Sequence, residues 1–229
     1  MSRMIELTAA DGTRVGAYEA RPAQGSPRGA VVVIQEIFGV NAHIRNVADG
    51  YAQAGYLAIA PDMFQRVQAG AQLGYEQADM AEGMRLKSAA EALPAPGVLQ
   101  DIQAAIDHAA RESGGKVGIV GYCWGGLLTW RSACLLEGLS AAVPYYGGGI
   151  TSETEAARTP QVPVLAHFAA QDHWIPLDGV NALRARHPGI QVEVYGANHG
   201  FNCDQRAAWH APSAQLARER TLAFFARHL

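Results

Sequence analysis

The sequence predicts an α/β protein with one doubly wound, mostly parallel sheet, an antiparallel hairpin at its N-terminus and helices on both faces. Residues 30–34 (AVVVI) are continuously apolar and largely β-branched, which is typical of a strand covered on both sides. Strand patterns then alternate with helical patterns, as βαβ units require. An Asp-Gly pair at 11–12 separates strand-like segments at 4–8 and 14–18, which indicates a hairpin.

The remaining elements follow from periodicity. We expect helices at 43–54, 98–112, 124–136, 177–187 and 211–228, and strands at 56–60, 116–120, 141–146, 164–168 and 190–195. Polar residues, glycines and prolines interrupt the alternation at 65–96, so we expect a partly helical insertion near the site there. No repeat or linker divides the chain, and we expect a single domain over residues 1–229.

Composition excludes several classes of protein. A chain of 229 residues with 49% hydrophobic and 17% charged residues can bury a large core, so disorder is excluded as its main state. Lys and Arg total 18 against 21 Asp and Glu, which leaves no basic surface for a nucleic acid partner. No apolar run reaches the roughly 18 residues of a membrane span, and the N-terminus lacks a signal-peptide pattern. We expect a cytoplasmic protein without a membrane partner, as a monomer or homodimer.

The three cysteines, Cys123, Cys134 and Cys203, are odd in number and widely spaced. This excludes a disulfide framework and agrees with a cytoplasmic location. Each cysteine is then either a small buried hydrophobe or a nucleophile, and the local sequence decides between them.

The hexapeptide GYCWGG at 121–126 directly follows a predicted strand and opens a predicted helix. This G-x-C-x-G pattern is typical of a nucleophile elbow, in which small residues at Gly121 and Gly125 permit a strained turn. Such a turn places the Cys123 sulfur at a helix N-terminus, which favours a thiolate and a developing oxyanion. It also makes the backbone N–H of Trp124 an oxyanion donor. The alternative is glycine packing at a strand-to-helix junction.

Candidates for an acid and a base follow two later strands. α/β-Hydrolases place nucleophile, acid and base in that chain order. Here Asp172 follows the strand at 164–168 and His199 follows the strand at 190–195, at the edge of the sheet where ligands bind. Asp172 would orient His199, which would take the proton of Cys123 and later activate water. Alternatively, Asp172 caps its loop and His199 is a solvated loop residue.

The other histidines form no H-x-x-x-H or H-E-x-x-H pair, so we expect no metal and no cofactor. His43 begins a predicted helix and is expected at the surface. His167 lies within a strand and is expected to be a hydrogen-bonded core residue, while His173 adjoins Asp172 and can line the site.

With these residues in view, the chain resembles the dienelactone hydrolase (carboxymethylenebutenolidase) family of α/β-hydrolases over nearly its whole length. The resemblance is carried by segments 33–41 (VIQEIFGVN), 60–64 (APDMF), 120–126 (VGYCWGG), 145–147 (YYG), 171–173 (QDH) and 199–201 (HGF). It implies hydrolysis of a small ester or lactone through an acyl-thioester, with Cys123, Asp172 and His199 as a triad. It also implies that Glu36 contacts the resting cysteine and that the backbone N–H of Ile37 is the second oxyanion donor.

Glu36 also has an argument of its own, since it ends a buried apolar strand. A carboxylate is costly there unless it has a partner or a task, and an ion pair with an arginine at the sheet edge would supply the partner. By the resemblance, Glu36 instead accepts a hydrogen bond from protonated Cys123 until substrate displaces it. A thiol that is neutral at rest is also protected from oxidation.

Substrate-binding residues are less defined by the sequence. Family members that act on carboxylated lactones hold the carboxylate with arginines, but Cys203 occupies the position four after the base histidine. Arg85 and Arg206 are the candidate anchors, and each can equally be a solvated surface residue. Cys203 itself is a candidate pocket residue. The other candidate pocket residues are aromatic, and core packing is their alternative role: Phe38, Tyr122, Tyr145, Trp174 and Phe201.

Two rival functions stay open. A class I glutamine amidotransferase also uses a G-x-C-x-G turn, but it predicts a His-x-Glu pair where His199 is followed by Gly200 and Phe201. The second rival is a non-catalytic binding or redox-sensing protein, in which Cys123 is oxidised reversibly with Cys203 as the resolving thiol.

Overall fold

A single sheet of eight strands, in the order β1-β2-β4-β3-β5-β6-β7-β8, forms the centre of the molecule. The computed structural model describes residues 1–229. The strands are β1 (Ser2–Thr8), β2 (Arg14–Ala20), β3 (Ala30–Ile34), β4 (Leu57–Pro61), β5 (Val117–Tyr122), β6 (Leu139–Tyr145), β7 (Leu165–Ala169) and β8 (Gln191–Tyr195). β2 pairs with β1 and β4 in antiparallel fashion, and all other pairs are parallel. The predicted sheet and its N-terminal hairpin are confirmed.

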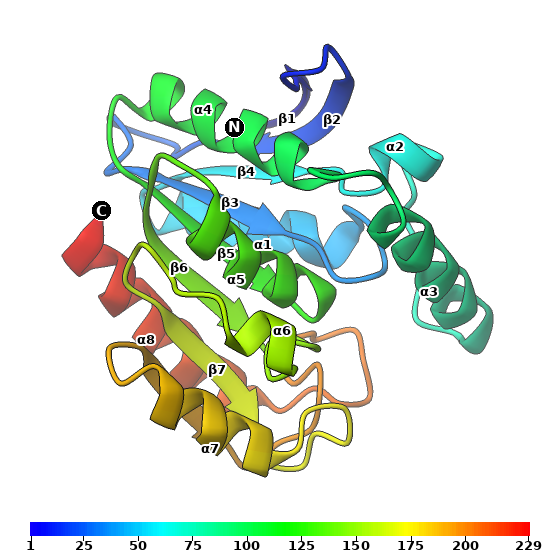
Figure 1. The fold of residues 1–229 in the computed structure, drawn as a ribbon. Coiled ribbons are helices and arrows are strands. Elements are labelled where there is room, and N and C mark those ends of the chain that lie inside the picture. Colours follow the sequence, from blue (N-terminus) through cyan, green and yellow to red (C-terminus); the bar gives the residue numbers. More distant parts are fainter.

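Helices cover both faces of this sheet, as predicted for a doubly wound fold. Figure 1 shows α1 (Ala42–Gln53) and α8 (Ala211–His228) behind the sheet and α4 (Leu99–Ser113), α5 (Trp124–Leu135) and α7 (Leu177–Arg186) in front of it. The shorter or peripheral helices are α2 (Gln65–Gln68), α3 (Gln77–Glu91) and α6 (Glu153–Ala156). No helix combines the length and the apolar character that crossing a membrane would require.

The core lies between the sheet and these helices as one cluster of 63 buried hydrophobic residues. Every residue of β3, β4 and β5 is buried, which explains why these segments read as continuous apolar runs. The backbone of β5 also touches α8 closely, because a Cβ on Gly118 would lie 2.7 Å from a ring carbon of Phe225. Burial of the central strands thus fixes the positions of the loops that follow them.

The strand order places a crevice at the carboxyl ends of β3 and β5. From β3 the chain moves to β4 on one side, and it then returns to β5 on the other side of β3. The loops that follow β3 and β5 therefore run in opposite directions and leave a crevice between them. In open α/β sheets, ligands bind in such a crevice. The loop after β3 carries Glu36 and Ile37, and the turn after β5 carries Cys123.

The segment 65–96 contains α2 and α3, which lie at the right-hand edge of the molecule in Figure 1. α3 packs directly on the loop after β3, since a Cβ on Gly83 would lie 2.4 Å from the carbonyl oxygen of Ile37. Gly39 in the same loop forms an isolated bridge with Gln72. The segment is thus held against the loop that borders the crevice.

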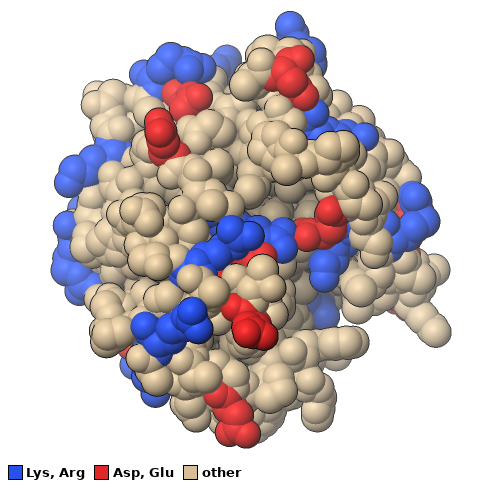
Figure 2. Space-filling model, viewed as in Figure 1, with Lys and Arg blue, Asp and Glu red and all other residues tan.

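The structure differs from the predicted elements in details. α6 was not expected, and β6 runs from Leu139 to Tyr145 rather than over 141–146. β6 ends there because Tyr146 has a left-handed φ of 35°, which breaks the extended conformation. Charged side chains on the face shown in Figure 2 are intermixed, with Lys and Arg next to Asp and Glu, as the balanced composition predicts.

Candidate active site

Cys123 lies in a strained turn between β5 and α5, with φ 55° and ψ −116°. A Cβ on Gly121 would lie 2.2 Å from the carbonyl oxygen of Gly125, and a Cβ on Gly125 would lie 2.3 Å from the carbonyl oxygen of Gln35. Both positions must therefore be glycine for the turn to form. The G-x-C-x-G pattern has the strand, turn and helix that the elbow interpretation requires.

Asp172 and His199 are brought together by the loops after β7 and β8. His199 Nδ1 lies 2.7 Å from Asp172 Oδ2, and the backbone N–H of Trp174 donates to Asp172 Oδ1 at 2.8 Å. Because the carboxylate can only accept, Nδ1 carries the proton in this pair. The other ring nitrogen, Nε2, is thereby available as a base.

The electrostatics of His199 involve Cys123 directly. Burial acts to lower the pKa of His199, but the negative charge of a Cys123 thiolate and the hydrogen bonds with Asp172 and Cys123 raise this pKa from 6.5 to about 10. The charged imidazolium form of His199 is therefore favoured at this position. This arrangement can support nucleophilic attack by Cys123 and proton transfer by His199.

A cavity of about 130 Å³ opens onto Cys123 and His199. Its other lining residues are Ile37, Phe38, Met80, Met84, Lys87, Trp174 and Arg206. Of the predicted substrate-binding residues, Phe38, Trp174 and Arg206 thus lie where expected, with the Trp174 side chain 77% exposed at the rim.

Sequence reasoning missed the three residues that α3 contributes to this cavity, Met80, Met84 and Lys87. Their spacing of four and three residues places them on one face of a helix. This periodicity within 65–96 was the signal that could have identified them.

The two expected oxyanion donors border the same crevice. The Trp124 N–H is in the first turn of α5, where a helix supplies no acceptor of its own. The Ile37 N–H donates to no backbone carbonyl. Both groups are therefore free to donate to a ligand.

The expected hydrogen bond between Cys123 and Glu36 is absent. Glu36 is 1% exposed, its Oε1 accepts a hydrogen bond from Arg206 Nη1 at 3.3 Å, and its Oε2 has no partner. Glu36 instead forms the ion pair with an arginine that was its alternative role. Arg206 reaches this carboxylate across the ring of Phe38, with its guanidinium carbon 5.5 Å from the ring centre.

Five predicted substrate-binding residues do not line the cavity, and Arg85, Tyr122 and Tyr145 are three of them. Arg85 is on the outer face of α3, where its guanidinium pairs with Glu82 at 2.7 Å and its side chain is 58% exposed. Tyr122 and Tyr145 instead line a separate cavity of about 360 Å³ between α1 and α8. Tyr122 points away because side chains alternate across a strand and it immediately precedes Cys123.

Phe201 and Cys203 are fully buried behind the cavity rather than in its wall.

Tyr146 lies next to His199 and was not predicted from the sequence. Its ring contacts the His199 ring edge-on, with 5.1 Å between the ring centres, and its buried hydroxyl has no hydrogen-bond partner. Its left-handed backbone, at the end of β6, turns the ring toward the histidine. No pattern in the sequence distinguishes it from its neighbour Tyr145.

Predictions were also made for three other histidines, and only the one for His167 is confirmed. His167 is confirmed as a core residue, with its ring nitrogens 2.8 Å from Tyr195 Oη and 3.0 Å from Thr221 Oγ1. His173 is exposed and does not line the cavity. The expectation for His43 was wrong, because it is 3% exposed and its Nδ1 lies 3.1 Å from Asp204 Oδ1.

The sheet, the cysteine elbow and the His–Asp pair at the carboxyl ends of the strands define an α/β-hydrolase fold. The sequence profile of the dienelactone hydrolase family matches residues 15–229, and the chain belongs to this family. It is 34% identical to the carboxymethylenebutenolidase of Pseudomonas putida over 97% of this chain and 95% of that protein. A crystal structure of a candidate dienelactone hydrolase from Klebsiella pneumoniae is 35% identical, with a TM-score of 0.83 over 99% of this chain and 98% of that one.

The elbow geometry predicts the effect of two glycine substitutions. Gly125→Ala places a methyl group 2.3 Å from the carbonyl of Gln35, whereas Gly148→Ala meets nothing within 4 Å. We expect Gly125→Ala to lower the free energy of unfolding by more than about 3 kcal/mol. Gly148→Ala should change it by less than about 0.5 kcal/mol. Urea unfolding followed by circular dichroism measures both, and equal stabilities would contradict the close packing of the elbow.

Proposed function

We propose that this chain is a cysteine-dependent hydrolase of small lactones or esters. The observation that carries the proposal is the convergence of the Cys123 elbow with the His199–Asp172 pair, joined at 2.7 Å, on one cavity. Family membership and the names of the relatives support an ester or lactone as the substrate class. The reaction needs no group beyond the side chains and backbone of the chain and a water molecule.

In the proposed mechanism, the Cys123 sulfur attacks the substrate carbonyl while the N–H groups of Ile37 and Trp124 stabilise the oxyanion. The intermediate collapses to an acyl-thioester, and the imidazolium of His199 gives its proton to the leaving alkoxide. His199 then removes a proton from water, whose oxygen attacks the thioester and releases the acid. Asp172 keeps His199 oriented and stabilises its charged form throughout.

The position of Glu36 changes how the nucleophile is activated. Since Glu36 is paired with Arg206, the sulfur of Cys123 has His199 as its ionisable partner. The raised pKa of His199 favours its charged form beside Cys123, so His199 rather than Glu36 is the proposed activating partner. This route differs from the one implied by the family resemblance, in which substrate must first displace Glu36.

The cavity favours a small acyl group that carries negative charge. Its walls are apolar at Ile37, Phe38 and the two methionines of α3, while Lys87 and Arg206 supply cations. Arg206 is neutralised by Glu36, whereas Lys87 has no carboxylate partner. A substrate carboxylate would therefore pair with Lys87, which favours a carboxylated lactone over a neutral ester.

The redox rival receives less support from the surroundings of Cys203. Burial raises the pKa of the Cys203 thiol from 9.0 to about 11, and the charge of Glu36 acts in the same direction. A resolving thiol must be accessible and easily ionised, and Cys203 is neither.

Removing the nucleophile tests the proposed function. We expect Cys123→Ala to reduce kcat/KM on a dienelactone at least about 1,000-fold, because the acyl-thioester cannot form. Asp172→Asn should reduce it about 100- to 10,000-fold, because His199 loses its orienting acceptor. Both variants should keep the wild-type circular dichroism spectrum. Activity within a few-fold of wild type in folded Cys123→Ala protein would refute the mechanism.

The identity of the carboxylate anchor gives a second test. We expect Lys87→Met to reduce kcat/KM about 10- to 100-fold on a carboxylated enol-lactone and much less on a neutral aryl ester, since only the former loses a charged partner. Arg85→Met is the matched control, because its guanidinium already pairs with Glu82 on the outside of the same helix. Equal losses on both substrates, or a larger loss in Arg85→Met, would exclude Lys87 as the anchor.

The coupling of His199 to Cys123 predicts a pH dependence. The imidazolium should persist below about pH 10 and lose its proton as the pH rises through that value, so acylation should fall there. In Cys123→Ala the thiolate charge is gone, and the pKa of His199 should move down toward 6.5. NMR titration of the His199 ring measures this change. Cys134→Ala is the control, and an identical His199 titration in all three proteins would contradict the coupling.

A further inference from the structure

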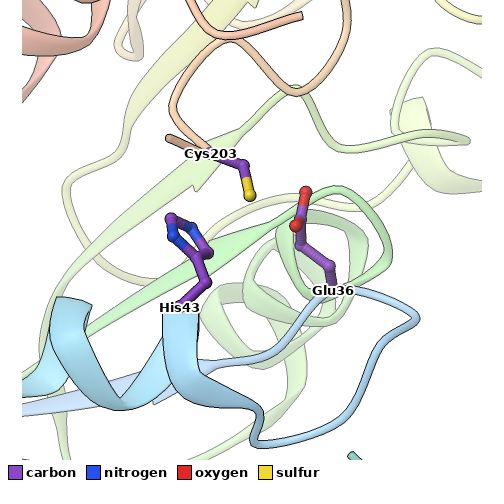
Figure 3. Close-up of side chains that lie close together, drawn as sticks. All are labelled: Glu36, His43 and Cys203. Carbon is purple, nitrogen blue, oxygen red and sulfur yellow. The ribbon is translucent and has the colours of Figure 1, made fainter. Parts of the chain in front are cut away.

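Three side chains outside the substrate cavity converge on one buried point. Glu36 comes from the loop after β3, His43 from the first turn of α1 and Cys203 from the loop between β8 and α8, as Figure 3 shows. Their ligand atoms lie within 4.8 Å of one another, and the residues are 1%, 3% and 0% exposed. We call these three residues the Glu36 cluster.

Two atoms of the Glu36 cluster are acceptors without a donor. His43 Nδ1 lies 3.1 Å from Asp204 Oδ1, so it carries the ring proton and leaves a lone pair on Nε2. Glu36 Oε1 accepts from Arg206, which leaves Oε2. His43 Nε2 and Glu36 Oε2 are both buried and have no hydrogen-bond partner in the protein. Buried acceptors of this kind require a positive or proton-bearing group between them.

The third atom of the cluster is Cys203 Sγ, which is 0% exposed and lies within 4.8 Å of the other two ligand atoms. A bound metal ion stabilises the thiolate form of a cysteine, so this sulfur can act as a ligand although burial alone favours the thiol. The sulfur therefore offers a third ligand atom beside the nitrogen and the oxygen.

We propose that Glu36 Oε2, His43 Nε2 and Cys203 Sγ bind a divalent cation of the Zn²⁺ type. Nitrogen, oxygen and thiolate sulfur are the ligands that such a cation of borderline softness prefers. Asp204 fixes the tautomer of His43 from the outside, as carboxylates do for metal-bound histidines. On binding, the thiol of Cys203 releases its proton to solvent, and the charges of Glu36, Asp204 and Cys203 balance those of Arg206 and the cation.

The proposed cation would position the active site without touching the substrate. None of its three ligands lines the cavity of Cys123. Glu36 immediately precedes the oxyanion donor Ile37, and Cys203 lies in the loop that carries His199. The cation would therefore tie these two loops together. The separate cavity beside α8, which His43 and Asp204 line, gives it a path from solvent.

A cobalt titration tests the site without measuring catalysis. Co²⁺ reports thiolate ligation through charge-transfer absorption in the near ultraviolet, and it takes the same ligands as Zn²⁺. The titration uses the full-length Cys123→Ala protein, so that the nucleophile cannot bind the metal. We expect one equivalent of Co²⁺ to bind with this absorption and Zn²⁺ to displace it.

Matched variants on the Cys123→Ala background assign the ligands. Adding Cys203→Ser should abolish the absorption, while Cys134→Ser, which alters the other partly buried free cysteine, should retain it. Adding Asp204→Asn should weaken binding about 10- to 100-fold, since His43 loses its orienting acceptor. His43→Gln provides a second ligand variant in case Cys203→Ser does not fold.

Two results would overturn the cation site. One is no stoichiometric binding by folded Cys123→Ala protein, which would mean that a proton or a water molecule joins Glu36 and His43. The other is an absorption that survives both Cys203→Ser and His43→Gln. Neither result bears on the proposed hydrolase activity, because the protein under test lacks the nucleophile.

Discussion

The contact between three backbones at the elbow is the constraint on which the site depends. Gly121 of β5, Gly125 of α5 and the carbonyl of Gln35 after β3 pack so closely that no Cβ fits between them. This contact joins the two central strands at the point where their loops diverge. It fixes the strained backbone of Cys123, and it fixes the start of the loop that carries Ile37. The proposed nucleophile and one proposed oxyanion donor are therefore positioned by the same packing rather than by flexible side chains.

Ion pairs then determine which charged side chains remain available for the proposed reaction. Glu36 is neutralised by Arg206, Asp172 is committed to His199, and Arg85 is committed to Glu82. These pairings leave Cys123 with His199 as its ionisable partner and leave Lys87 as a cation without a carboxylate. The proposed reaction depends on these two unpaired positions. A Cys123 thiolate can form beside the His199 imidazolium, and a substrate carboxylate can bind Lys87 in the same cavity.

Features that depend on local sequence patterns could be predicted from the sequence. The buried strands, the hairpin, the elbow and the loop positions of Asp172 and His199 each follow from residues near one another in the chain. Contacts between segments that are far apart in the sequence could not be predicted, because they depend on the folded structure. The pairing of Glu36 with Arg206 and the burial of His43 against Asp204 depend on how loops from different strands meet. No spacing in the chain encodes these contacts, which is why Cys203 and Tyr145 were expected in the cavity and Tyr146 was not.

The packing of α3 on Ile37 links substrate selection to reaction rate. Gly83 lies against the carbonyl oxygen of Ile37, at the opposite end of the residue from the N–H that would hold the oxyanion, and Met80, Met84 and Lys87 project from the same helix into the cavity. A ligand that presses on these three side chains would also displace Ile37, the proposed oxyanion donor. Substrates that bind with equal affinity but shift α3 by different amounts would then react at different rates. Discrimination between substrates would therefore affect kcat as well as KM.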